Sequence, residues 1–215
     1  MKVAIIGATG FVGTALVSEF AARGHRATAI SRNPKEDAPE GVTNVKADIF
    51  DTKSLTEILS GHDVVISAYN PGWSNPDIFE DYLRGARFIQ DAVKKSGVGR
   101  YIVIGGAGSL YVASGLQLVD TPKFPQEFKP GATAVRDYLN ILKAENELDW
   151  VFFSPAIEMH AGINTGRTGK YRLGFDSPVF DESHRNTLSV EDLAVVIADE
   201  AETPRFRRQR FTAGY

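Results

Sequence analysis

Several kinds of functional site are excluded by what this chain of 215 residues lacks. It has no cysteine, which excludes a disulfide, a thiolate nucleophile, a zinc-thiolate centre and an iron–sulfur cluster. Its histidines are few, and His160 and His184 stand too far apart to indicate a metal site. The apolar run near the start, Val3 to Ile6, is far shorter than a signal-peptide core or the ~20 residues that span a bilayer. We therefore expect no metal, no membrane association and a cytoplasmic protein.

Charge and composition are those of an ordinary globular protein. The net charge is −3 and 43% of the residues are hydrophobic, so there is no basic excess to indicate binding to nucleic acid or an anionic membrane. The chain is long enough for one α/β domain with a sizeable core, whereas two domains would each be small. We expect a single domain, residues 1–215, that acts on a small molecule. The sequence leaves the formation of a homo-oligomer open.

Short apolar runs alternate with amphipathic stretches along the chain. The apolar runs cover residues 2–7, 26–31, 43–49, 63–69, 100–106 and 149–156, and the amphipathic stretches cover 11–23, 53–60, 76–96 and 132–147. This alternation predicts βαβ units and a parallel sheet with helices on both faces. Gly24, Gly61 and Gly97 follow three of the stretches, where a left-handed helix exit favours glycine.

The last third of the chain adds a helix and a strand. Ser189 with Asp192 three places on resembles a capping box at the start of a late helix. Residues 207–215 are expected to form a last strand, and the arginines of 205–211 indicate a charged edge strand. Two long irregular stretches, 107–131 and 157–186, are the expected substrate region, because long loops in a compact domain commonly bind ligands.

A glycine turn follows the first predicted strand and leads into a helix. In IIGATGFVGTAL, Gly7 allows a tight turn, Gly10 lets a pyrophosphate approach the backbone, and Gly13 allows close helix packing. The helix start offers free N–H groups and a positive dipole to the anion. The alternative is a turn that merely needs small residues, but the strand–turn–helix context favours dinucleotide binding. The same turn adds Thr9, Phe11 and Val12 to the predicted cofactor contacts.

The end of the second predicted strand indicates which dinucleotide is preferred. It offers Ser31, Arg32 and Asn33, with no carboxylate before Glu36. An acidic residue here would bind the ribose 2′-OH of NAD, whereas an arginine favours the 2′-phosphate of NADP. We expect NADP as the cofactor, with NAD possible, because Arg32 can pair with that phosphate. The alternative is an exposed loop arginine.

Two further strand ends contribute to the predicted cofactor site. Asp48 and Ile49 are expected to end the third strand and to meet the adenine, although Asp48 could equally cap a turn. Ala68 and Tyr69 follow the fourth strand and are expected to pass beneath the nicotinamide ribose.

The motifs GATGFVG, SRNP and ADIFD, with the run from DWVFFSPA through LSVEDLAVVIADE to RFTAGY, resemble the atypical short-chain dehydrogenase/reductases. This branch includes NAD-dependent epimerase/dehydratase and NADH-flavin reductase types. The resemblance covers essentially the whole chain and implies a Rossmann-like, doubly wound parallel sheet. Residues 1–156 would form the cofactor-binding core, and 157–215 a small C-terminal substrate part. It also implies that Ser154, Pro155 and Ala156 flank the nicotinamide, although Pro155 could simply end the strand.

A tyrosine four residues before a lysine on one helix would be the expected proton-delivery pair of such enzymes. In VRDYLNILKAE, Tyr138 is followed at that spacing by Leu142, and Lys143 comes one place late. Residues five apart are rotated by ~140° around a helix, so Lys143 cannot replace the missing partner. Tyr138 either keeps a catalytic role or packs its ring on the sheet. Lys143 and Glu145 are expected on the solvated face.

Two other groups of residues are candidates for substrate contacts. Ser109 and Tyr111 follow the fifth predicted strand, whose carboxyl end faces the ligand crevice, so Ser109 joins Tyr138 as a catalytic candidate. Arg167, Lys170 and Arg172 lie within six residues and could clamp an anionic substrate. A solvated loop or an edge strand is the alternative for these cations.

Three functions remain open from the sequence. The first is a reductase that transfers hydride from NADPH to a flavin- or quinone-like acceptor, which fits the loss of the tyrosine–lysine pair. The second is an epimerase or dehydratase acting on a nucleotide sugar, with Tyr138, Ser109 or Tyr111 in acid–base roles. The third is a non-catalytic module that senses NADP(H).

Overall fold

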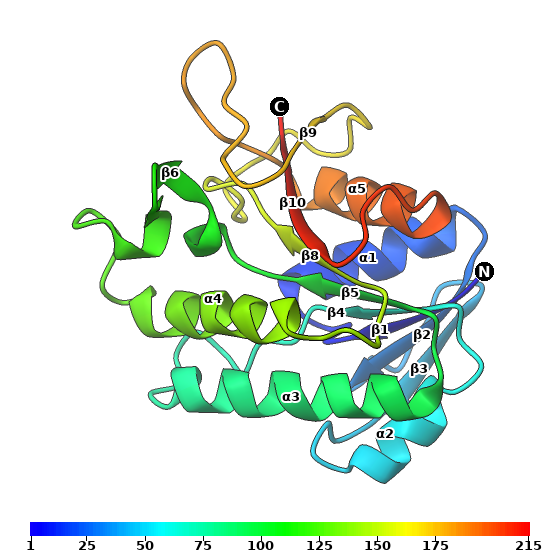
Figure 1. Ribbon diagram of the computed structural model, residues 1–215. Coiled ribbons are helices and arrows are strands. Elements are labelled where there is room, and N and C mark those ends of the chain that lie inside the picture. The colour runs from blue at the N-terminus through cyan, green and yellow to red at the C-terminus, as the bar shows by residue number, and fades with distance from the viewer.

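The computed structural model describes residues 1–215 as a mostly parallel sheet between two layers of helices (Figure 1). The strands of this sheet are β1 Lys2–Ile6, β2 Arg26–Ser31, β3 Val42–Lys46, β4 Val64–Ser67, β5 Arg100–Ile104, β8 Trp150–Ser154, β9 Arg172–Gly174 and β10 Gln209–Gly214. A separate hairpin joins β6 Tyr111–Ala113 to β7 Leu116–Gln117. The helices are α1 Phe11–Ala22, α2 Thr52–Leu59, α3 Ile78–Ser96, α4 Lys129–Lys143 and α5 Val190–Glu202, with short 3-10 turns η1 Ala107–Ser109 and η2 Leu118–Asp120.

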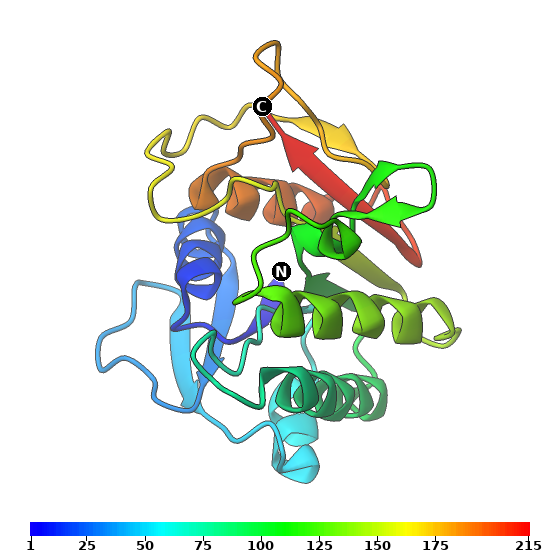
Figure 2. The ribbon, with the colours of Figure 1, turned by 90° about the vertical axis from the view of Figure 1, so that its left-hand side faces the viewer.

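The strand order is β3-β2-β1-β4-β5-β8-β10-β9. The chain first builds outward from β1 through β2 to β3, and then crosses back to place β4 on the other side of β1. The order therefore reverses at β1 and β4, and in open α/β sheets ligands bind at the carboxyl ends of the strands that flank such a reversal. Figure 2 looks onto this edge of the sheet, where the strands end and the helices α1, α3 and α4 begin. The predicted doubly wound α/β fold is confirmed.

Alternate residues of the strands feed two cores. Val3 and Ile5 of β1 belong to the core under α1 and α5, whereas Ala4 and Ile6 belong to the core under α2, α3 and α4. This two-sided burial explains why the strands have continuous apolar runs rather than alternating ones. Glycines follow the ends of α1, α2 and α3 as predicted. Gly24, Gly61 and Gly97 all have a positive φ, the left-handed conformation in which the chain leaves a helix.

Two predicted boundaries differ from the structure. The helix expected at 132–147 runs from Lys129 to Lys143, with Pro130 in its first turn, where a missing N–H does no harm. The third strand ends at Lys46 rather than Ile49. The side chain of Asp48 accepts the N–H of Phe50 (3.0 Å), so Asp48 caps a turn after the strand.

The arginine-rich segment 205–211 is expected to form a charged edge strand, but only its last three residues belong to a strand, β10, and β10 is not the edge of the sheet. β10 lies between β8 and β9: residues 209–212 pair in parallel with β8, and residues 212–214 pair in antiparallel with β9. Its Arg210 is buried, pairs with Asp176 and donates to the carbonyl of Ser109. The edge is β9 instead, because the loop that follows β8 returns to cover β10.

A charged network joins the end of α1 to α5. Arg23 pairs with Glu19 (2.8 Å) in its own helix and with Asp199 and Glu202 of α5 (2.7 Å each). Arg167 reaches across from the loop before β9 and binds Glu19 through two nitrogens (2.7 and 2.8 Å). These hydrogen bonds from Arg167 and Arg23 hold the pKa of Glu19 below its ordinary value, despite its burial. The Ser189 cap at the start of α5 is confirmed, since its hydroxyl accepts the N–H of Asp192 (3.0 Å).

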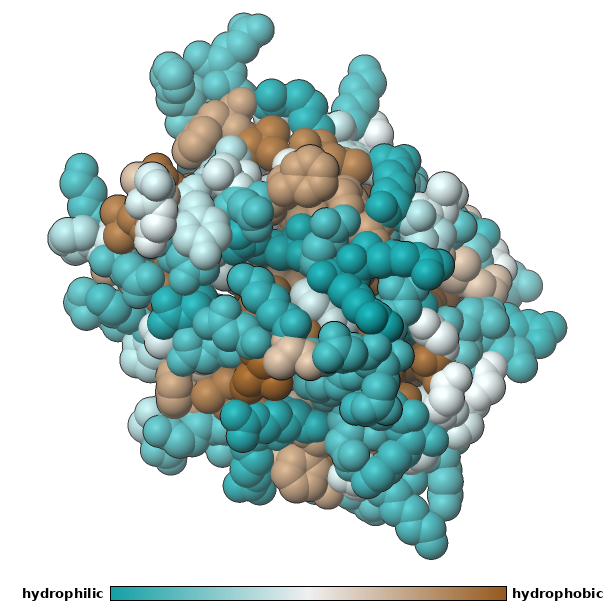
Figure 3. Space-filling view, in the orientation of Figure 1, coloured by the Kyte–Doolittle hydropathy of each residue, from teal (hydrophilic) through white to brown (hydrophobic).

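Outer surfaces are mostly polar. On the face seen in Figure 3, hydrophobic residues form separate areas among hydrophilic ones. None of the helices combines the length and the hydropathy that crossing a membrane would require.

Candidate cofactor and substrate site

The glycine turn between β1 and α1 lies at the reversal of strand order. Gly7 has φ of +80°, and a Cβ there would lie 2.5 Å from the carbonyl oxygen of Ala68. A Cβ on Gly13 would lie 2.8 Å from both the carbonyl carbon of Gly7 and the Cα of Ala8. The fold itself therefore requires these two glycines. Gly10 differs, because its φ is −76° and a Cβ would meet only the oxygen of Gly7, at 3.3 Å.

The start of α1 is left open to an anion. Gly10 is the N-cap residue and supplies no side-chain hydrogen bond, and the carbonyl of Gly10 accepts from Thr14 (2.9 Å). This is the first hydrogen bond of the helix, so the N–H groups of Phe11, Val12 and Gly13 have no partner within it. Such groups seek partners outside the helix. Together with the helix dipole they favour a phosphate. Thr9, which is exposed, stands beside these three residues.

The end of β2 carries a buried hydroxyl without a partner. Ser31 is buried, yet its Oγ makes no hydrogen bond within the protein, and a buried polar atom normally has one. Arg32 and Asn33 follow it and are exposed. Burial, followed by the charge of Asp81, raises the pKa of Tyr69 to about 12, and the charge of Arg32 opposes that rise.

Lys35 and Asn44 are two residues of this region that sequence analysis missed. A hollow between α1, the end of β2 and the loop that follows is lined by Thr9, Ser31, Lys35, Asn44 and neighbouring residues. Asn44 holds the loop by donating to the carbonyls of Lys35 (2.8 Å) and Asp37 (3.1 Å). The lysine directly after SRNP was the available signal. No signal in the local sequence indicates the contact that Asn44 of β3 makes with this loop.

The remaining predicted cofactor residues border the same edge. Ala68 packs on the glycine turn, and its N–H donates to Ile6 (2.9 Å). The hydroxyl of Tyr69, which is half-buried, donates to the carbonyl of Asp81 (3.1 Å). Asp48 is exposed and Ile49 is buried in the turn after β3. Ser154 ends β8, Pro155 and Ala156 follow it, and all three are buried.

These residues fit a dinucleotide. The space at Gly10, the unpaired N–H groups of α1 and the unpartnered hydroxyl of Ser31 lie along one edge of the sheet. The first two would hold a pyrophosphate, and Ser31 would bind the adenosine ribose region next to Arg32.

Ser109 lies inside the protein rather than on an open surface. It is 1% exposed. Its Oγ donates to the carbonyl of Gly106 (2.9 Å) and is 2.9 Å from the Oγ of Ser154. The hydroxyl of Ser109 is therefore already engaged. Tyr111 is half-buried on β6, and Arg210 lies over its ring at 5.2 Å.

Tyr138 packs in the core beneath α4. Its side chain is 0% exposed, and its hydroxyl donates to Gln90 of α3 (3.2 Å) and lies 3.4 Å from that of Tyr101. Burial, followed by the neighbouring Tyr101, raises the pKa of Tyr138 well above its ordinary value. This environment supports the packing interpretation of Tyr138. Leu142, which holds the place of the absent lysine, is equally buried.

Lys143 is exposed as expected, but the prediction for Glu145 is wrong. Glu145 is buried and binds the side chain of Gln90 (2.9 Å) and the N–H of Glu147 (2.7 Å). Burial alone would raise the pKa of Glu145, but the hydrogen bonds from Glu147, Gln90 and Lys94 lower it to about 2. Glu145 lies just after α4, where the chain turns back toward β8, and there it joins α3 to that turn.

The three clustered cations do not form an anion clamp. Arg167 is bound to Glu19, and Arg172 donates to the carbonyls of Phe180 and Tyr215. Lys170 is exposed. Arg167 and Arg172 thus hold the loop and β9 in place. This supports the alternative interpretation, a solvated loop and an edge strand.

The strand order and the glycine turn define an α/β dinucleotide-binding protein. The family described as NAD(P)H-binding matches residues 7–204, and the chain belongs to this family. The predicted membership of an NAD(P)H-binding Rossmann family is confirmed, and the protein is an NAD(P)-binding, oxidoreductase-like protein.

Some relatives match essentially the whole chain. The uncharacterized protein YwnB of Bacillus subtilis (strain 168) is 32% identical over 214 residues, which cover 99% of this chain and 97% of that protein. A solved structure from Bacteroides thetaiotaomicron named "putative epimerase" is 43% identical with a TM-score of 0.91, covering 100% of this chain and 96% of that one. A "putative NADH-flavin reductase" from Streptococcus pneumoniae TIGR4 is 34% identical with a TM-score of 0.87, covering 100% and 99%.

Proposed function

We propose that this protein is an NADPH-dependent reductase that delivers a hydride to a planar acceptor, such as a flavin or a quinone. The observation that carries the proposal is the burial of two of the three candidate proton donors, Tyr138 and Ser109. Tyr138 is bonded to Gln90 and Ser109 to Gly106, so neither hydroxyl is free to serve an acid–base step. The third candidate, Tyr111, is half-buried, and Arg210 lies over its ring. This arrangement supports a reaction that does not depend on proton donation from Tyr138 or Ser109.

A planar conjugated acceptor is suited to that situation. When bound, the nicotinamide supplies the hydride, two electrons with one hydrogen. A flavin or quinone ring spreads the added charge over its conjugated system and takes its proton from solvent. The protein then has to hold two rings in register and exclude side reactions. The name of the 34% identical relative, "putative NADH-flavin reductase", is consistent with this proposal.

Preference for NADP(H) is part of the proposal. Arg32 is exposed directly after the last residue of β2, and Ser31 beside it has an unpartnered hydroxyl. A guanidinium and a hydroxyl together suit a phosphate monoester, whereas a carboxylate at this place would repel it. The neighbouring Lys35 adds a second positive charge on the same side.

An acceptor screen tests the proposal. Oxidation of NADPH would be followed by its absorbance with free FMN, FAD, a naphthoquinone and nucleotide sugars. We expect oxidation with the flavins or the quinone, one acceptor reduced per NADPH. Conversion of a nucleotide sugar without net NADPH consumption would instead establish the epimerase alternative, which the name of the 43% identical relative favours. Tight NADP(H) binding with no conversion of any compound would establish the sensing module.

A further inference from the structure

Two large aromatic side chains stand exposed where the loop after β4 meets the start of α4. Trp73 is 53% exposed and Phe128 is 44% exposed, whereas the other tryptophan, Trp150, is 1% exposed. The rings of Trp73 and Phe128 pack edge to face, 5.5 Å apart at 82°. Aromatic pairs bury large areas and are usually found inside. A pair of this kind left in solvent marks a surface that a ligand can cover.

The exposure of Trp73 does not come from a loose loop. A Cβ on Gly131 would lie 2.8 Å from the indole ring, so the ring rests against the first turn of α4. The loop is held by its own side chains, because Asn70 accepts from Gly72 (2.7 Å) and Asn75 donates to Asp81 (2.9 Å). The indole is therefore presented in a defined orientation, which lowers the entropy cost of stacking a ligand on it.

The aromatic pair lies at the ligand edge of the sheet. Ala68 touches the glycine turn at Gly7. Trp73 follows only five residues later, and five residues of extended chain span at most ~18 Å. Phe128 immediately precedes α4, which starts at the same edge (Figure 2). The two rings thus lie on the side of the sheet at which the parallel strands end, where the cofactor is expected.

We propose that Trp73 and Phe128 form a stacking platform that binds the conjugated ring of the acceptor. This inference rests on the proposed reductase function and names the side chains that select its substrate class. A planar ring that covers the exposed indole gains both apolar burial and ring–ring contact. A sugar presents hydroxyl groups that would lose water there without a partner. The platform accordingly selects planar acceptors over hydroxylated ones.

The kinetic test compares Trp73→Ala, Trp73→Phe and Phe128→Ala with the wild type, using NADPH with FMN or with 1,4-naphthoquinone. We expect Trp73→Ala and Phe128→Ala to raise the KM for both acceptors about tenfold or more, in line with the loss of ring–ring contact and apolar burial. The kcat and the affinity for NADPH should stay within about threefold, since neither ring is a chemical participant. Trp73→Phe keeps a ring in place and should restore most of the acceptor affinity.

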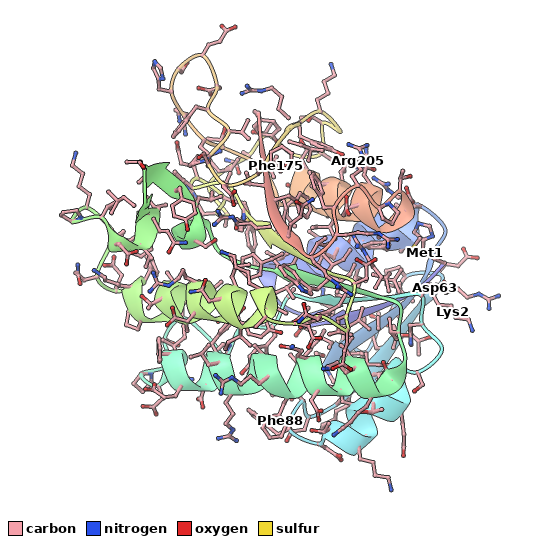
Figure 4. The ribbon with its side chains drawn as sticks, viewed as in Figure 1. Met1, Lys2, Asp63, Phe88, Phe175 and Arg205 are labelled. Atoms are coloured by element: carbon pink, nitrogen blue, oxygen red, sulfur yellow. The ribbon has the colours of Figure 1, made fainter.

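Phe88→Ala is the matched control. Phe88 is also exposed and packs edge to face on another aromatic ring, Phe50, at 5.3 Å and 81°. Figure 4 shows it on the side of α3 turned away from α4. Its removal should leave both KM values unchanged, and circular dichroism should show that every variant is folded. A KM that is unchanged in Trp73→Ala and Phe128→Ala, or equally raised in Phe88→Ala, overturns the platform.

A binding measurement separates the platform from the reductase proposal. Phe128→Ala retains both tryptophans, and the more exposed Trp73 is the one that a stacked ligand would quench. With NADP⁺ present, 1,4-naphthoquinone should quench the wild-type fluorescence saturably, and Phe128→Ala should need about tenfold more of it. Saturable quenching without NADPH turnover would support the platform while refuting the reductase. Turnover without saturable quenching would refute the platform and leave the reductase in place.

Discussion

Gly13→Ala and Gly10→Ala should separate stability from cofactor binding, although both add a single methyl group to the same turn. On Gly13 the new Cβ would lie 2.8 Å from the carbonyl carbon of Gly7 and from the Cα of Ala8, and closer still to the Gly7 oxygen. Ordinary carbon contacts are about 3.5–4.0 Å, and backbone atoms of a tight turn cannot rotate away. On Gly10 the Cβ would meet only one oxygen, at 3.3 Å.

The magnitudes follow from this geometry. Overpacking against rigid atoms costs Gly13→Ala about 3 kcal/mol, at the upper end of the usual range. Replacing glycine by alanine inside a helix returns about 1 kcal/mol. The net loss of about 2 kcal/mol corresponds to a fall in Tm of about 4–8 °C for a chain of this length. Gly10→Ala changes an N-cap residue, where glycine and alanine differ by at most about 1 kcal/mol, so its Tm should fall by no more than about 2–4 °C.

Thermal unfolding followed by circular dichroism, together with NADPH titration, tests this contrast. Gly10→Ala should bind NADPH at least about tenfold more weakly, a loss of about 1.4 kcal/mol, because the methyl group occupies the space through which the pyrophosphate approaches the backbone. If Gly10→Ala kept full affinity, the turn would have only a structural role. If Gly13→Ala melted at the wild-type temperature, the packing argument for this glycine would be refuted.

Three further predictions address other sites. Arg32→Ala should weaken NADP(H) binding by about 1–3 kcal/mol and leave NAD(H) nearly unchanged, and calorimetric titration showing equal wild-type affinities for the two cofactors would remove the argument. Tyr138→Phe should keep NADPH-dependent turnover within about tenfold of wild type, because general acid–base residues contribute about 10²–10⁴-fold, and a thousandfold loss with intact cofactor affinity would support the epimerase alternative. The pKa of Glu145 is about 2 in the folded protein and 4.5 ordinarily, so its stabilising effect is complete above pH 4.5 and is lost as the pH falls toward 2. Urea unfolding of Glu145→Gln should therefore show a weaker decline in stability over that interval than wild type, and parallel curves would count against the assignment.

Local sequence patterns predicted the parts of this fold that depend on neighbouring residues. The apolar runs indicated six parallel strands, and the glycines marked where α1 starts and where three helices end. The glycine turn was assigned to a dinucleotide from its spacing and context alone, and the chain does belong to an NAD(P)H-binding family.

Contacts between distant residues could not be predicted in the same way. Arg167 and Glu19 are 148 positions apart, and Arg210 and Ser109 are 101 apart. No local pattern indicates that an arginine in a loop will be neutralised by a carboxylate in the first helix. The same limit explains the misplaced edge strand, since β9 covers β10 only because the loop after β8 folds back. The burial of Glu145 likewise depends on Gln90 of another helix.

The ion pairs at the end of α1 have a thermodynamic consequence for its beginning. Glu19 and Arg23 are joined to α5 and to Arg167, so the helix is immobilised when the chain folds and not when a ligand arrives. A ligand that meets N–H groups already fixed in place loses less free energy to the ordering of its receptor. Charges near one end of a helix of 12 residues, about 18 Å long, thereby contribute to affinity at the other end without touching what is bound there.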